Sequence, residues 1–132
     1  MLNRRLIRIK VFKVLYAAEA SGQVSLPAAE KELLLSCGKT LDLYYFLLNL
    51  PAALAKVAAE KIEIGRSKFN PSESELKAST RFVDNRFIAM LGEDETFGGM
   101  CRRKGLDWSE YDVFLKKLYA SVASSDYYQE YM

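Results

Sequence analysis

Apolar residues recur at the three- and four-residue spacing of α-helices along almost the whole chain, and this periodicity limits the fold more than any other feature. No sustained alternation of apolar and polar residues lies between tight-turn signals, so no β-strand is predicted. Half of the 132 residues are apolar, which is enough for one hydrophobic core. We therefore expect an all-α protein in which residues 1–132 form a single helical-bundle domain of about five to seven helices.

Capping and turn residues predict where these helices begin and end. Ser21 and Gly22 are expected to end the first helix, and Pro51 to end or kink the second. Asn70 and Pro71 are typical of a helix start, and Ser109 with Asp112 resembles a capping box. The expected helices cover residues 3–20, 27–50, 52–64, 71–91, 95–104 and 109–123, and Ser124 and Ser125 are expected to cap a last short turn.

Burial can also be predicted from helical spacing. The first helix carries apolar residues on most of its circumference, so all but its first turn is expected to be buried. In the helix predicted over 71–91, the residues expected to point into the core are Leu76, Phe82, Val83, Phe87 and Met90.

Residue types that are absent argue against several classes of function. The chain has no histidine, which removes the usual general base and metal ligand, and it has no glycine-rich phosphate-binding loop. The acidic residues 93–95 are consecutive, so their side chains would not converge on one metal ion. We therefore expect a protein that is not an enzyme and binds no cofactor or metal.

Two further features bear on where in the cell the protein is found. Cys37 and Cys101 lie far apart in a chain without a signal-peptide pattern, so we expect reduced thiols and a cytoplasmic protein. The most apolar stretch, residues 41–59, is interrupted by Asp42, Pro51 and Lys56. It is therefore expected to be a core helix and not a membrane span.

Positive charge is concentrated at the start of the chain. Residues 1–16 contain five cations and no acid and contribute +5, whereas the remaining 116 residues contribute −3 to the net charge of +2. Cations at a helix N-terminus oppose the helix dipole, and an anionic partner would relieve this cost. The alternative is a basic first turn that is merely solvated. The candidate RNA-binding residues are Arg4, Arg5, Arg8, Lys10 and Lys13.

The pattern Arg4-Arg5-x-x-Arg8, followed by apolar spacing and Leu15-Tyr16, resembles the opening helix of NusB-type transcription antitermination factors. The match covers about residues 4–16. The remaining helices are compatible with the N-terminal half of a longer member of that family. The resemblance implies an all-helical protein without enzymatic activity that binds boxA-like single-stranded RNA through this helix.

It also implies two partners, a NusE-like ribosomal protein and, through it, the transcription elongation complex. The alternative is a helical protein–protein interaction module that binds no nucleic acid. In that case the basic start of the first helix would face an acidic protein surface. RNA affinity that depends on salt would distinguish the two.

Overall fold

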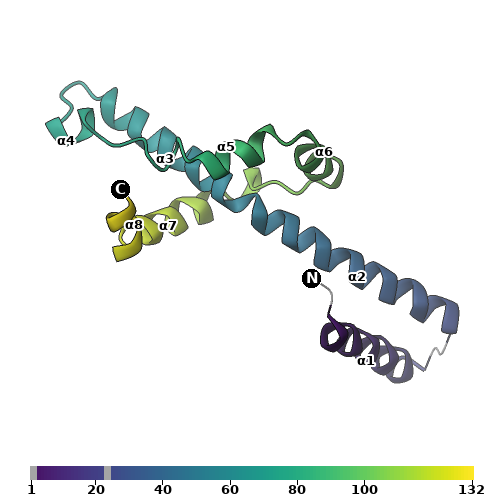
Figure 1. The fold of residues 1–132 in the computed structure, drawn as a ribbon. Coiled ribbons are helices and arrows are strands. Elements are labelled where there is room, and N and C mark those ends of the chain that lie inside the picture. The colour runs from purple at the N-terminus through teal and green to yellow at the C-terminus, as the bar shows by residue number, and fades with distance from the viewer. Residues whose placement is uncertain (1–2, 23–24) are drawn as a thin grey trace. The chain divides into compact units, whose positions relative to one another are not determined.

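The computed structural model describes residues 3–22 and 25–132, and all secondary structure in these residues is helical (Figure 1). Seven α-helices are six or more residues long, and a one-turn helix and a short 3-10 helix complete the set. The all-α prediction is therefore confirmed. The elements are α1 (Arg4–Ala20), α2 (Leu26–Leu48), α3 (Leu50–Arg66), α4 (Glu73–Leu76), α5 (Arg86–Glu93), α6 (Glu95–Lys104), η1 (Ser109–Tyr111), α7 (Asp112–Ala123) and α8 (Asp126–Tyr131).

The chain forms two compact units, Met1–Tyr45 and Phe46–Met132, called unit 1 and unit 2 below. The expectation of a single domain stays a prediction. Pro51 lies in the first turn of α3, where its missing N–H costs no hydrogen bond. Asn49 separates α2 from α3, so the proline ends one helix and starts the next, as its chemistry predicts.

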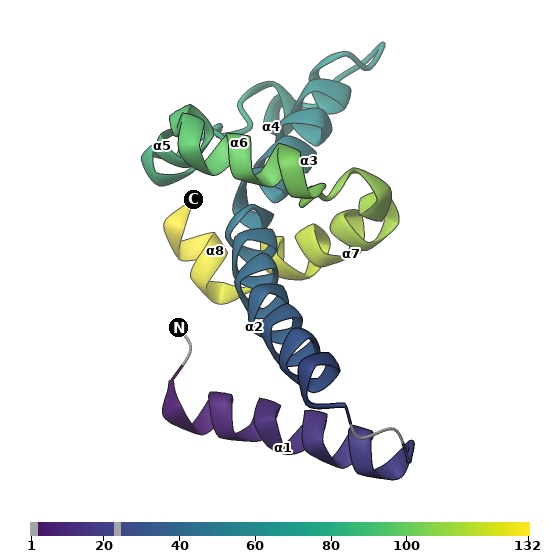
Figure 2. The ribbon, with the colours of Figure 1, turned by 90° about the vertical axis from the view of Figure 1, so that its right-hand side faces the viewer.

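Unit 1 is a helical hairpin of α1 and the greater part of α2 (Figures 1 and 2). The Asn3 side chain caps α1 by accepting the Leu6 N–H at 2.8 Å. Neither helix contains a buried residue, and Phe12 and Tyr16 are each 68% exposed. The expectation that most of α1 is buried was therefore wrong. Within this unit α1 has only one neighbouring helix, which cannot cover an apolar surface that extends most of the way round.

Unit 2 is organised around α3, which contacts α4, α5 and α7, while α5 contacts α6 and α7 contacts α8 (Figures 1 and 2). The apolar face of α3 supplies half of the buried core cluster, and Trp108, Leu115 and Tyr119 supply the rest. Partly buried residues, among them Phe46 and Phe82, pack around this cluster. The α3 residues in the cluster are Leu54, Val57 and Ala58.

Trp108 anchors the loop between α6 and α7. Its ring stacks on Phe46 with centroids 4.0 Å apart, and its Nε1–H donates to the Phe46 carbonyl at 2.9 Å. Asn49 donates from its side-chain amide to the Leu106 carbonyl at 3.2 Å in the same region. These contacts satisfy polar groups that burial would otherwise leave unpaired.

The helix predicted over residues 71–91 is broken into α4 and α5, and this prediction was wrong. Asn85 is extended and caps α5, because its Oδ1 accepts the backbone N–H groups of Phe87 and Ile88 that an uninterrupted helix would bond to earlier carbonyl groups. Such local bonds compete with the helix.

Burial in this region follows the break. Phe82 and Val83 pack against the core as expected, whereas three other residues expected to be buried are about half exposed: Leu76, Phe87 and Met90.

The cap predicted at Ser109 was also wrong in detail. The N–H and hydroxyl groups of Ser109 both donate to the Asp107 carboxylate, so a 3-10 turn precedes α7. Hydrogen bonds from Ser109 therefore lower the pKa of Asp107. The cap predicted at Ser125 is present, because its Oγ accepts the Tyr128 N–H at 3.4 Å.

Glu75 makes the start of α4 sensitive to acid. Its carboxylate accepts hydrogen bonds from Lys68 and from the backbone and side chain of Ser72, in that order of effect, and these lower its pKa from 4.5 to about 2. Because the folded state favours the ionised form, this stabilisation is complete above pH about 4.5 and is lost as the pH falls towards about 2. We expect an NMR titration of the Glu75 carboxyl carbon to show a midpoint near pH 2.

Lys68→Met should raise that midpoint, because it removes the largest cause of the shift. A wild-type midpoint at the ordinary glutamate value would contradict the capping geometry.

Candidate nucleic-acid interface

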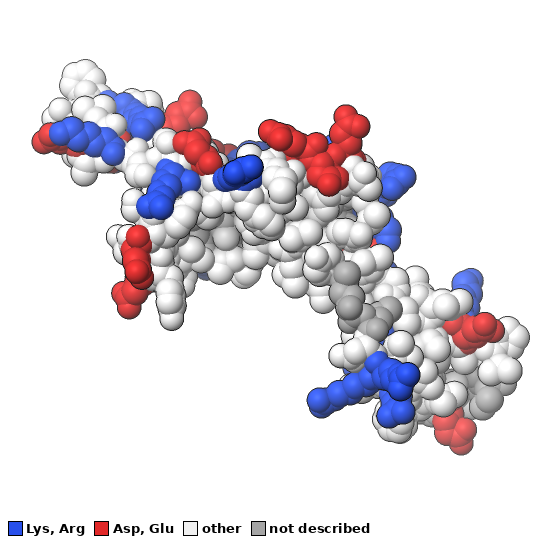
Figure 3. All heavy atoms as spheres, in the orientation of Figure 1, with Lys and Arg blue, Asp and Glu red and all other residues white. Residues whose placement is uncertain are grey.

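The three arginines of the candidate site lie in the first two turns of α1, where all three are exposed. At about 100° per residue they fall within roughly a third of the helix circumference. Figure 3 shows Lys and Arg side chains gathered over α1. The guanidinium groups of Arg4, Arg5 and Arg8 therefore face solvent together.

No hydrogen bond or ion pair joins these guanidinium groups to any other part of the chain that the structure describes. The first turn of α1 also contains no acidic residue. An exposed cation in the first turn of a helix costs about 0.3–1 kcal/mol, and Arg4 and Arg5 lie in the first turn of α1. The arrangement thus has an unfavourable electrostatic energy that a bound polyanion would reverse.

The two lysines of the candidate set are separated by the fold. Lys10 is partly buried and donates from Nζ to both the carbonyl and the hydroxyl oxygen of Ser36, each at 2.8 Å. Lys13 is exposed about 80° round the helix from Arg5. Lys10 therefore fastens α1 to α2, whereas Lys13 can extend the basic surface of the arginines.

Aromatic side chains continue this surface along the helix. Phe12 and Tyr16 are one helical turn apart, and their rings lie nearly parallel, with centroids 6.2 Å apart and an interplanar angle of 21°. This pair was not predicted from the sequence, because the apolar periodicity of the first helix placed both residues in the core. Phe12 and Tyr16 follow Arg5 by seven and eleven residues, which are close to two and three helical turns. This spacing could have placed all three on the same face of the helix.

A shallow apolar hollow of about 300 Å³ lies inside unit 1. Its lining comes from the inner side of α1, including Val11 and Val14, and from the start of α2, including Ala29 and Leu33. Glu30 is the one charged residue in that lining. The hollow therefore lies on the side of α1 that faces α2.

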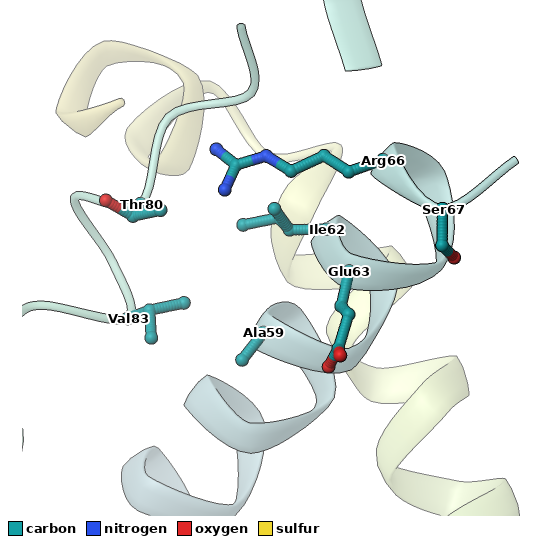
Figure 4. Close-up of a pocket in the computed structure, with 7 residues that line it drawn as sticks. All are labelled: Ala59, Ile62, Glu63, Arg66, Ser67, Thr80 and Val83. Atoms are coloured by element: carbon teal, nitrogen blue, oxygen red, sulfur yellow. The ribbon is translucent and has the colours of Figure 1, made fainter. Parts of the chain in front are cut away.

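In unit 2, a hollow between α3 and residues 80–83 is shown in Figure 4. Ala59, Ile62 and Val83 make it largely apolar. The Arg66 side chain reaches along it towards Thr80 in Figure 4, and its Nη2 donates to the Ala78 carbonyl at 3.0 Å. The guanidinium of Arg66 therefore fastens the segment after α4 to the end of α3.

Other charged clusters have structural explanations. Arg102, Arg103 and Lys104 occupy the last turn of α6, where the helix dipole favours cations. Asp94 caps the same helix by accepting the Phe97 N–H at 2.7 Å. Among residues 3–22 and 25–132, no three metal-ligating side chains come close enough together to hold an ion.

The stretch Leu26–Arg66, which contains α2 and α3, is long and apolar enough to cross a membrane by length and composition alone. Core helices of soluble proteins meet the same criterion, and α3 carries the buried residues Leu54, Val57 and Ala58 of unit 2. The part of this stretch in α3 is thus a core helix, as the sequence predicted.

Comparison of the chain with protein-family models, with curated proteins and with solved structures gave no match.

Proposed function

We propose that this protein is an RNA-binding transcription antitermination factor of the NusB type, in which the start of α1 binds boxA-like single-stranded RNA. The observation that supports this most strongly is the exposure of three guanidinium groups without a partner among the described residues. Arginine suits this role because its planar, fixed charge binds phosphate oxygens through two hydrogen bonds. Arg4, Arg5 and Arg8 would therefore contact the RNA backbone.

Lys13 extends the same surface and is proposed as a further phosphate contact. Lys10 stays a predicted RNA contact, although two hydrogen bonds to Ser36 give it a role in fastening the hairpin. A few phosphate contacts give weak binding on their own, so the proposal includes a NusE-like ribosomal protein that completes the RNA site. Recruitment to the transcription elongation complex would follow from that pairing.

Salt dependence tests the proposal directly. We expect the affinity of the full chain for a boxA-like RNA oligonucleotide, measured by fluorescence anisotropy, to fall as salt rises. Three neutralised phosphates on a single strand predict a slope of log K against log salt of about −2. Addition of a NusE-like ribosomal protein should raise the affinity at every salt concentration. Affinity that is flat across the salt series would contradict phosphate binding.

A second candidate function is a helical interaction module without nucleic acid. It is favoured by the exposed leucines of α2, among which Leu26 is 77% and Leu34 is 66% exposed. A partner helix could cover such side chains. Capture of a protein partner that is lost with Leu34→Glu, together with RNA affinity that does not change with salt, would support this candidate over the first.

A further inference from the structure

We propose that Phe12 and Tyr16 form a stacking platform for the bases of single-stranded RNA, beside the arginines that bind its phosphates. This inference rests on the proposed function and deepens it. In this proposal α1 contacts the bases of the RNA as well as its phosphate backbone. The platform is defined here as the two rings of Phe12 and Tyr16.

The two rings share one face of α1 with cations. On a helical wheel, Ile9, Phe12 and Tyr16 fall within about 60° of one another, and Arg5 falls inside the same sector. Arg8 and Lys13 lie at its two edges. The residues that face α2, such as Lys10, lie on the opposite side of the helix. The basic and aromatic side chains thus form one continuous outward strip.

Both rings of the platform are largely exposed to solvent. Both are 68% exposed, although large aromatic side chains gain most from burial. Their main ring contact is with each other, at 6.2 Å between centroids. Two nearly parallel rings in solvent offer flat apolar faces, which is the arrangement on which unpaired bases stack.

The charge of the strip favours a nucleic acid as the ligand. No acidic residue occurs in α1 before Glu19, so a polyanion meets only positive charge from Arg4 to Lys13. The distance along the helix from Arg5 to Tyr16 is about 17 Å. A single strand could place phosphates on the arginines and bases on the rings within that length. A second copy of α1 would instead bring like charges together.

The test uses the full chain and two labelled probes of equal length, a decauridylate and an abasic ribose-phosphate oligomer. Anisotropy titrations at low salt compare the wild type with Phe12→Ala and Tyr16→Ala. We expect each substitution to weaken decauridylate binding about fivefold or more, because it removes one stacking face. Binding of the abasic probe and the salt slope should not change, because the phosphate contacts are retained.

Matched controls separate stacking from general effects. Phe69→Ala removes a fully exposed phenylalanine in unit 2 and should leave both affinities unchanged. Phe12→Trp should retain or increase decauridylate affinity, whereas Phe12→Leu, which keeps an apolar side chain without a ring, should reduce it. Circular dichroism should show that helix content is the same in all variants, since the substituted side chains are exposed.

Three outcomes would overturn the platform. Equal wild-type affinity for the two probes, with the expected salt slope, would reject stacking and leave the proposed function intact. Loss of binding to vesicles of anionic phospholipid in Phe12→Ala, without a change in decauridylate affinity, would assign the strip to a membrane surface. No binding of either probe by the wild type would reject the platform and the proposed function together.

Discussion

The triple substitution Arg4→Glu, Arg5→Glu and Arg8→Glu is expected to abolish RNA binding while it leaves the thermal melt almost unchanged. All three side chains are exposed and have no partner among the described residues, so no internal contact is lost. Acidic residues at a helix N-terminus are favoured by about 0.3–1 kcal/mol each, so the melt should rise slightly if it moves at all. Anisotropy titration with a boxA-like RNA, together with a circular dichroism melt, checks both parts.

The matched control reverses three cations elsewhere. Arg102→Glu, Arg103→Glu and Lys104→Glu change the net charge by the same amount, but at the C-terminal end of α6. RNA affinity should stay close to wild type, and the melt should fall because negative charge at that end opposes the dipole. If both triple variants lose RNA affinity equally, the net charge of the protein and not the α1 surface controls binding.

Trp108→Ala is expected to lower the free energy of unfolding of unit 2 by about 3–5 kcal/mol, the usual cost of emptying a buried aromatic site. Trp108 is 8% exposed, stacks on Phe46 and contacts the rings of Tyr111 and Phe114. Its loss also leaves the Phe46 carbonyl without the indole donor. Urea denaturation followed by circular dichroism measures the change.

Two further variants sharpen this prediction. Trp108→Phe keeps much of the ring packing and removes the N–H donor, so it should cost less than Trp108→Ala. Phe69→Ala, at a fully exposed position, should alter stability by less than about 0.5 kcal/mol. A Trp108→Ala variant within about 1 kcal/mol of the wild type would show that the aromatic cluster is not a main support of unit 2.

Element positions could be predicted from the sequence where a side chain caps a helix locally. Asn3 and Ser125 act within a few residues of themselves, so the bounds of α1 and α8 follow from short-range chemistry. The break between α4 and α5 could not be predicted in this way. Asn85 caps α5 locally, but Phe82 in the same segment also packs against Tyr119 and Tyr128, which are 37 and 46 residues further along the chain and which helical spacing does not identify.

In the candidate site, too, some features follow from the local sequence and others depend on residues far away in the chain. The arginine cluster is a local pattern, and the helical wheel places its members on one side. The different roles of Lys10 and Lys13 depend on Ser36, a residue on another helix that periodicity does not identify. Burial of α1 was predicted wrongly because a pattern of apolar residues shows which sides can be covered, and not whether a neighbour is present.

The single tryptophan of the chain lies in the core of unit 2, whereas the arginines and the stacking platform belong to unit 1. Indole emission is therefore a built-in optical reporter of one unit only. Tryptophan emission, excited at a wavelength that tyrosine does not absorb, should report the melting of unit 2 alone. A change in that emission on RNA binding, after correction for absorption by the RNA, would show that binding affects the surroundings of Trp108 in unit 2.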